Sequence, residues 1–247
     1  MVEQIGCGKI WGGNRNVDMD LCTSSLETSL CSFSCQGGKG GDLYYYSVCS
    51  TDRLSRIVVG DVVGHGDEVS HISSWVYDSL KKYQNNLAGN EILIGLNNAI
   101  YERGLDAMTT AAVVAYFIGD QNFYFSYAGH HPALIRRKGE QEWRPAEIKS
   151  DENVANLPLG IQKDIQYQQR HIQLKPGECF FLFTDGVIEA QNDCKEMYGL
   201  NRLICVLNKI PENDPQCIKK AVLRDLDEYC HGKLDHDDVT AIAIKIH

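Results

Sequence analysis

The stretch LYYYSVCSTDRLSRIVVGD, Leu43–Asp61, contains two apolar runs on either side of a short polar connection. Leu43–Cys49 and Leu54–Val59 have the length and the aromatic and β-branched composition of strands. The connection, residues 50–53, has the length of a hairpin loop. The stretch therefore predicts an antiparallel hairpin, and its second strand leads directly into an acidic residue, Asp61.

Strands and helices outside this hairpin also come in groups rather than in alternation. Apolar residues spaced by three or four predict helices, and short apolar runs between turn residues predict strands. The predicted strands lie at 109–119, 122–128, 133–137, 178–186 and 239–246, and the predicted helices at 67–86, 91–103, 196–208 and 215–230. This grouping favours an α+β fold of two packed, mainly antiparallel sheets with helix pairs outside, and disfavours a doubly wound parallel sheet.

Length and charge limit the number of domains and the kinds of partner that the chain can have. A chain of 247 residues is most simply one domain, here predicted to span 1–247 with residues 1–36 as an N-terminal extension packed on it. The formal net charge of −9 argues against nucleic acid or an anionic membrane as a main partner. No run of 18 apolar residues and no signal-peptide core is present, so we expect a cytoplasmic protein.

Ten cysteines are spread along the chain without a CxxC pair. Paired spacing is typical of zinc sites, and disulfide frameworks belong mainly to small secreted domains. We therefore interpret the cysteines as reduced packing residues. Metal binding by some of them remains an open alternative, for Cys22, Cys31, Cys35 or Cys49.

Acidic residues flank buried-looking strands at three places. Asp61 ends RIVVGD, Asp185 ends FFLFTD, and Asp237 and Asp238 open the last strand in DDVTAIAIKI. Any one of them alone is better explained by a turn, because Asp and Gly are common turn residues, but the three places together favour a shared site. Carboxylates that meet at one place repel each other, so a shared site needs positive charge among them. Oxygen ligands favour hard divalent cations such as Mg²⁺ or Mn²⁺, which can support attack of water on phosphorus.

Six motifs occur in an order that resembles a known family. They are GGDLYY (40–45), GDVVGHG (60–66), the region from MTTAAVVAY to YAGHHPALIRR (108–137), LPLGI (157–161), FTDGVIEA (183–190) and DDVT (237–240). Together they resemble the bacterial, SpoIIE-type branch of the metal-dependent protein phosphatase 2C superfamily. The resemblance covers roughly residues 37–247. It implies a four-layer αββα sandwich with two divalent cations, Mn²⁺ or Mg²⁺, at one end of the packed sheets.

The resemblance also implies a ligand set. Asp61 would bridge both ions, and the main-chain carbonyl of Val62 would bind one of them. Asp185 and Asp237 would complete the protein ligands of one ion, and Asp42 would lie near the second ion. The residues expected to carry catalysis are accordingly Asp61, Asp185 and Asp237.

Two positions depart from the family pattern or leave their role open. Tyr45 stands where many relatives have an additional acid near the site. His65 is a candidate general acid toward the leaving oxygen, or else a residue that packs or hydrogen-bonds within its loop. The pair His130 and His131 precedes Pro132 and is better explained by a turn than by metal binding.

The resemblance predicts a metal-dependent protein serine/threonine phosphatase that uses a metal-activated water. By analogy alone, its substrate would be a phosphoprotein in bacterial signalling, such as a phosphorylated anti-sigma-factor antagonist. The alternative is a catalytically inert regulator of the same fold that binds a phosphoprotein. A third, weaker reading is a hydrolase of small phosphoesters or nucleotides. Residues 139–156 are a hypothesis for a docking surface, and the sequence leaves the oligomeric state undetermined.

Overall fold

The computed structural model describes residues 2–49, 51–104, 107–148 and 156–247, and their strands form two sheets. Sheet A contains, in spatial order, β1 (Val2–Gln4), β3 (Val17–Cys22), β4 (Leu26–Phe33), β13 (Val239–Ile246), β12 (Cys179–Phe183), β9 (Leu134–Arg136) and β10 (Arg144–Pro145). Sheet B contains β11 (Arg170–Gln173), β8 (Asn122–Ala128), β7 (Thr109–Phe117), β6 (Leu54–Val62), β5 (Lys39–Cys49) and β2 (Ile10–Arg15). Strand β1 runs parallel to β3, and the other named pairs are antiparallel.

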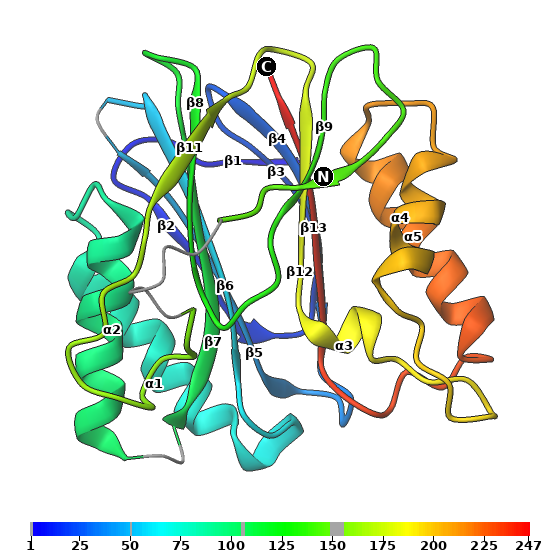
Figure 1. Ribbon diagram of the computed structural model, residues 1–247, viewed down its shortest axis with the longest axis horizontal. Helices are drawn as coiled ribbons and strands as arrows, with labels where there is room; N and C mark the ends of the chain where they lie inside the picture. Colours follow the sequence, from blue (N-terminus) through cyan, green and yellow to red (C-terminus); the bar gives the residue numbers. More distant parts are fainter. Residues whose placement is uncertain (1, 50, 105–106, 149–155) are drawn as a thin grey trace.

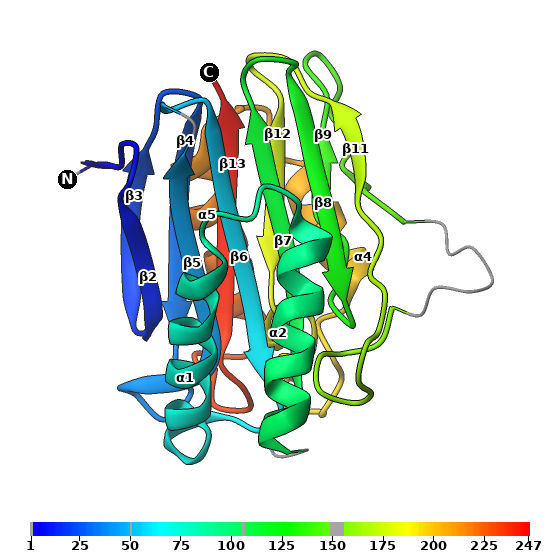
Figure 2. The ribbon, with the colours of Figure 1, turned by 90° about the vertical axis from the view of Figure 1, so that its left-hand side faces the viewer.

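A pair of helices covers the outer face of each sheet (Figure 1). Helices α1 (Ser70–Leu80) and α2 (Gly89–Arg103) lie across β5 to β8 of sheet B (Figure 2). Helices α4 (Leu200–Asn208) and α5 (Pro215–Tyr229) cover sheet A. The remaining helical segments are short: α3 (Asp185–Ile188), η1 (Gly66–Glu68) and η2 (Lys81–Tyr83). No helix among the described residues is long and apolar enough to span a membrane.

Alternation along the strands creates three apolar clusters. In β5, Tyr44 and Tyr46 point between the sheets, whereas Leu43 and Tyr45 point toward α1 and α2. In β12, Phe181 and Phe183 point toward α4 and α5. Successive side chains of a strand face opposite sides of its sheet, so each sheet is buried on both faces. The predicted four-layer αββα sandwich is therefore confirmed.

The structure extends and corrects the predicted elements. The hairpin is present as β5 and β6, but both strands continue to Asp42 and Asp61 and beyond. The predicted strand 178–186 ends at Phe183, and α3 begins at Asp185 instead. The sequence interpretation also missed the strands before residue 37, which contribute to both sheets. Short strands rich in Gly, Asp and Asn, such as those in 10–22, carry little strand signal.

All ten cysteines lie in the described residues, and each is a free thiol. Cys31 and Cys179 are buried in the cluster between sheet A and its helices. Burial raises the pKa of both thiols to about 12, which leaves them protonated and unreactive. These two residues therefore serve as packing residues.

Two buried arginines hold the connections between paired helices. Arg56 of β6 donates to the carbonyl oxygens of Gln84 and Asn86, between α1 and α2. Arg136 of β9 donates to the carbonyl oxygens of Ile210 and Glu212, between α4 and α5. Each guanidinium thereby satisfies carbonyl oxygens of the segment that connects two helices. A buried arginine of each sheet therefore holds the segment that connects the two helices on that sheet.

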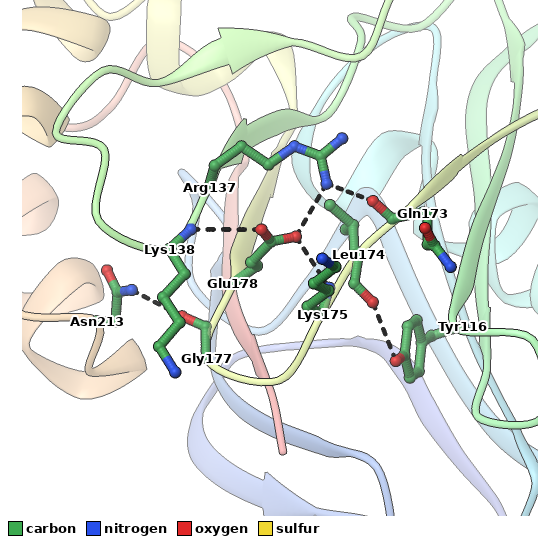
Figure 3. Close-up of polar contacts among 9 residues, drawn as sticks. All are labelled: Tyr116, Arg137, Lys138, Gln173, Leu174, Lys175, Gly177, Glu178 and Asn213. Carbon is green, nitrogen blue, oxygen red and sulfur yellow. Dashed lines mark hydrogen bonds and ion pairs between the residues drawn. The ribbon is translucent and has the colours of Figure 1, made fainter.

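At the start of β12 the chain crosses from sheet B to sheet A, and Glu178 fixes this crossing (Figure 3). Its Oε2 accepts hydrogen bonds from Arg137 Nη1 and Lys175 N, both at 2.9 Å, and its Oε1 accepts from Lys138 N at 3.4 Å. The Tyr116 hydroxyl donates to the carbonyl of Leu174 at 3.2 Å. The loop between β11 and β12 is thus tied to both sheets at the end where β12 begins.

We predict that Glu178→Gln lowers the free energy of unfolding by about 1–2 kcal/mol, because hydrogen bonds to a charged acceptor are lost while Arg137 remains half-buried. Urea denaturation measures the change. Glu142→Gln is the matched control, because the Glu142–Arg144 ion pair is exposed and should contribute less than about 0.5 kcal/mol. Equal effects of the two substitutions would contradict the assigned role of Glu178.

Candidate active site

Asp42 and Asp61 occupy the same rung of sheet B. The register of β5 and β6 places them directly opposite each other. Tyr44 and Val59 belong to the core between the sheets. Each lies two residues from one of the aspartates on the same strand, so both carboxylates are on that inner face. Only 3% of Asp42 and 8% of Asp61 is exposed. Like charges directly opposite in a ladder are destabilising, so this rung needs compensation from its surroundings.

A bulge in β5 positions Asp42. Strand β2 pairs Gly13 with Tyr44 but Arg15 with Lys39, so residues 40–43 of β5 bulge away from β2. The side-chain amide of Asn14 donates to the carbonyl of Gly40 at 3.2 Å within this bulge. The bulge therefore separates Asp42 from β2 while Asp42 still pairs with β6.

Sheet A contributes hydroxyl groups that orient Asp42. Thr184, directly after β12, donates from Oγ1 to Asp42 Oδ2 at 2.7 Å. The main-chain N–H of Thr240 in β13 donates to Thr184 Oγ1 at 3.0 Å. Thr240 Oγ1 also lies 2.8 Å from Ser32 Oγ of β4. This network of buried hydroxyls joins the two sheets at the level of the aspartates.

The sequence Asp185-Gly186 brings a third carboxylate to the site. A Cβ on Gly186 would collide with the carbonyl oxygen of Asp238, so only glycine allows this close approach of the two chain segments. Asp185 is half-buried, and its Oδ1 is buried without a hydrogen-bond partner among the described residues. An unpartnered buried carboxylate oxygen is a position where a cation fits.

The two consecutive acids before β13 have different environments. Asp237 is half-buried and accepts a hydrogen bond from the N–H of Asp238 at 2.8 Å. Asp238 is 1% exposed. Its Oδ1 accepts from Cys35 N at 2.9 Å, and its Oδ2 accepts from Gly41 N at 2.6 Å and Gly66 N at 3.1 Å. Asp238 therefore fixes the three segments that surround the site.

Burial and mutual repulsion raise the pKa values of the clustered acids. Desolvation raises the pKa of Asp61 well above its ordinary value, and the charges of Asp42, Asp185 and other acids raise it further. Desolvation also raises the pKa of Asp42 well above its ordinary value, against hydrogen bonds that lower it. The pKa of Asp237 rises to about 6, mainly through desolvation, although the charge of His65 lowers it. Without a cation the charged forms of these acids are therefore disfavoured, and a bound cation would favour them.

This donor set fits divalent cations. All the candidate side-chain ligands are carboxylate oxygens, which Mg²⁺ and Mn²⁺ prefer. The carbonyl oxygen of Val62 lies 3.0 Å from the position that a Cβ on Gly41 would occupy, so it borders the segment leading into Asp42. Among the described residues no three His, Cys, Asp or Glu side chains converge closely enough to hold one ion alone. Water would therefore supply the other ligands, as is common for Mg²⁺.

His65 lies at the exposed side of the cluster. Its Nδ1 is 3.5 Å from Cys35 Sγ, and its charge acts on Asp237. Desolvation and the neighbouring acids, chiefly Asp238, raise the pKa of the Cys35 thiol to about 11. His65 thus faces both solvent and the acids, while its part in proton transfer stays a prediction.

Three other residues singled out in the sequence lie elsewhere or act locally. Tyr45 faces α1, where its ring lies 6.2 Å from that of Tyr77, so it points away from the aspartates. His130 is buried, and desolvation lowers its pKa to about 4, which keeps it neutral. Its Nδ1 lies 2.8 Å from the carbonyl oxygen of His131, in the connection between β8 and β9.

Sequence reasoning missed the residues that support the aspartates. Thr184 and Thr240 stand within the FTDG and DDVT motifs. Each lies two residues from a core residue, Leu182 or Ile242, and therefore faces the interior between the sheets. That spacing could have identified both. Nothing in the sequence signals the role of Asp238, because its three partners lie more than 170 positions away.

Comparison with known proteins identifies the family. The model of the family "Stage II sporulation protein E (SpoIIE)" matches residues 51–247. The chain belongs to the SpoIIE family. The predicted relationship to the SpoIIE-type branch of the protein phosphatase 2C superfamily is thereby confirmed.

Curated SpoIIE relatives are distant and longer. Stage II sporulation protein E of Priestia megaterium is 22% identical over 252 aligned residues, which cover 100% of this chain and 41% of that protein. The protein of the same name from Bacillus subtilis (strain 168) is 23% identical over 199 residues, which cover 78% of this chain and 22% of that protein. The chain thus spans less than half the length of these relatives.

Solved structures share the fold of this SpoIIE-family chain. The phosphatase 2C domain of SpoIIE from Bacillus subtilis, with a fragment of its regulatory domain, matches with a TM-score of 0.75 at 20% identity, covering 91% of this chain and 64% of that one. The RsbU and RsbW domains of Rv1364c from Mycobacterium tuberculosis match with a TM-score of 0.76 at 21% identity, covering 94% and 64%. RsbX in complex with magnesium matches with a TM-score of 0.68 at 16% identity, covering 94% and 100%.

We predict that Asp238→Asn lowers the free energy of unfolding by about 1–3 kcal/mol, because an amide group must face backbone N–H donors that the carboxylate now satisfies. The sequence alone leads us to expect a milder loss of turnover than at Asp237, and that comparison stays a prediction. Urea denaturation with Asp227→Asn, an exposed acid, as control measures the stability. Unchanged stability of Asp238→Asn would refute the anchoring role.

The raised pKa values predict a pH-dependent response to metal. An acid whose pKa is raised in the folded state stabilises the fold below its ordinary pKa, and this stability is lost as pH rises through the folded value, about 6 for Asp237. A cation that binds the charged acids offsets that loss. We expect Mg²⁺ to raise the thermal midpoint clearly at pH 7.5 and little at pH 5.0, relative to chelator.

Thermal unfolding with and without Mg²⁺ at both pH values tests this expectation. Asp237→Asn should reduce the difference between the two pH values, whereas Asp235→Asn, at an exposed neighbouring acid, should not. A Mg²⁺ response of equal size at pH 5.0 and 7.5 in the wild-type protein would count against a carboxylate metal site.

Proposed function

We propose that this chain is a metal-dependent protein serine/threonine phosphatase that hydrolyses phosphoserine and phosphothreonine. The observation that carries the proposal is the Asp42–Asp61 rung between the sheets, together with Asp185 Oδ1, which has no hydrogen-bond partner in the described part of the chain. The charges that act on Asp61 come from other acids, so the cluster calls for cations. Membership of the SpoIIE family and the phosphatase 2C fold support the same activity.

The residues that would hold two Mg²⁺ or Mn²⁺ ions are those expected from the motifs: Asp42, Asp61, the carbonyl of Val62, Asp185 and Asp237. When bound, divalent cations would neutralise charge on the phosphoryl group and lower the pKa of water. Within the protein, Thr184 fixes the direction of the Asp42 carboxylate. Asp238 fixes Gly41 of β5 and Gly66 of η1.

Access from solvent suits a protein substrate. Asp185 and Asp237 are half-buried and His65 is exposed, so one side of the cluster opens to solvent. A phosphorylated side chain could enter there while its backbone stays outside. His65 is placed beside Asp237 and is our candidate for protonating the leaving oxygen.

The biological setting belongs to the same proposal. We infer a role in bacterial signalling, with a phosphorylated anti-sigma-factor antagonist as the candidate substrate and the cytoplasm as the location. The names of the relatives, which include stage II sporulation protein E, support this setting by analogy. The suggested docking segment 139–156 includes residues 149–155, which lie outside the described residues.

We predict that purified protein hydrolyses p-nitrophenyl phosphate only with Mn²⁺ or Mg²⁺, and that Asp61→Asn and Asp185→Asn each reduce kcat at least 100-fold. Both variants should stay folded, because each removes one of several repelling charges. Initial rates titrated with metal, with chelator as blank, measure the effect. Asp193→Asn, at an exposed acid paired with Lys233, is the control and should retain activity.

The outcomes separate the candidate functions. Wild-type turnover in either site variant would remove that residue from the site. A folded wild-type protein that hydrolyses neither this ester nor phosphoproteins with any metal would favour the catalytically inert regulator. Turnover of small phosphoesters or nucleotides without turnover of phosphoproteins would favour the small-molecule hydrolase.

A further inference from the structure

A polar pocket of about 300 Å³ lies beside the candidate active site, between β2, the start of β5 and α1. Its lining includes Asn14, Arg15, Lys39, Ser74, Tyr77 and Asp78. None of these residues is among the proposed metal ligands. The family model match begins at residue 51, so the strands that form one wall of the pocket lie outside it.

Two cations stand directly opposite each other in this pocket. The register of β2 and β5 pairs Arg15 with Lys39, and both side chains are exposed. Like charges at such a position repel each other. Among the described residues neither has an acidic partner within ion-pair distance, and the one acid in the lining, Asp78, lies 2.7 Å from Lys81. An anion between Arg15 and Lys39 would relieve their repulsion.

The pocket is connected to the aspartates through short contacts. The Asn14 amide donates to the carbonyl oxygens of Gly40, at 3.2 Å, and Ser70, at 2.8 Å. Ser74 donates to Asn14 Oδ1 at 3.2 Å. The preceding residue of α1, Ser73, donates to the carbonyl of Asp42 at 3.5 Å. An occupant of the pocket therefore lies next to the chain segment that carries Asp42.

Charge identifies the occupant. The protein has a formal net charge of −9, so a site with two cations and one already-paired acid contrasts with the rest of the chain. Arg and Lys are strong donors to carboxylate. The Tyr77 ring and the Ser74 hydroxyl add an apolar wall and a small polar group. A carboxylate on a short side chain matches this lining.

We propose that this pocket, called the Arg15/Lys39 pocket, binds an aspartate or glutamate of the protein substrate that lies near the phosphorylated residue. The proposal rests on the proposed phosphatase function and adds a determinant of substrate choice to it. The acidic residue anchors the substrate beside Gly40, and the phosphorylated side chain reaches the aspartates on the other side of that segment. Phosphoproteins with acidic flanks are therefore the preferred substrates.

The test uses two fluorescent phosphopeptides that differ only in their flanks, acidic in one and Asn/Gln in the other. Fluorescence anisotropy with the full chain in chelator measures binding without turnover. We expect the acidic peptide to bind about five-fold more tightly than the neutral one. This is the size of effect that two exposed ion pairs produce together. The Arg15→Gln/Lys39→Gln double variant should bind the two peptides equally.

Lys195→Gln/Lys220→Gln is the matched control, because both lysines are exposed, lie outside the pocket and change the net charge by the same amount. This control should keep the five-fold preference. If the double variant fails to fold, as judged by its thermal midpoint, Lys39→Gln alone should lower the preference to about two-fold. The same ratios should be found in kcat/KM with Mn²⁺.

The two proposals fail in different ways. Equal binding of both peptides by the wild-type protein, or the same loss of preference in the control pair, would overturn the Arg15/Lys39 pocket. Displacement of the peptides by inorganic phosphate through Arg15 and Lys39, without any preference for acidic flanks, would assign the pocket to free phosphate and also overturn it. Preference in binding without Mn²⁺-dependent hydrolysis of either peptide would support the pocket and overturn the phosphatase function.

Discussion

Repulsion between Asp42 and Asp61 is the constraint on which the arrangement of the site depends. The two carboxylates share a rung, face the interior between the sheets and are almost fully buried. An apolar interior alone could not hold them in charged form. Two features of the surrounding structure bear on this: the Thr184 hydroxyl of sheet A orients Asp42, and Asp185 Oδ1 has no hydrogen-bond partner among the described residues. The packing of two sheets with facing inner sides makes both possible.

The fold itself could be predicted in large part, because its strongest determinants are local. The hairpin of β5 and β6 and the helices α1, α2, α4 and α5 follow from periodicity in their own segments. The strands β2 and β3 could not be predicted, because their stability comes from pairing with β5 and β4 rather than from their own composition. The boundary at Asp185 was also missed, and the close approach of Gly186 to the Asp238 carbonyl, which joins two distant segments there, leaves no local signal.

Only the site residues that belong to sequence motifs could be predicted. Asp42, Asp61, Asp185 and Asp237 were named from the sequence, and the structure brings them together, although their role as ligands stays a proposal. What the motifs omit is support from distant segments. Asp238 illustrates this: its three hydrogen bonds come from segments that no spacing rule connects to residue 238. Long-range hydrogen bonds of this kind are a property of the fold and leave no periodic signal.

The N-terminal strand β2 is a second example of a distant segment that shapes the site. Strand β2 extends sheet B beyond β5, and the bulge at residues 40–43 follows from the way β2 pairs on both sides of it. The same pairing sets Arg15 against Lys39 and places Asn14 on Gly40. The segment that positions Asp42 therefore also forms one wall of the Arg15/Lys39 pocket. A change in β2 would act on both features, so the pocket and the position of Asp42 are coupled through one bulge.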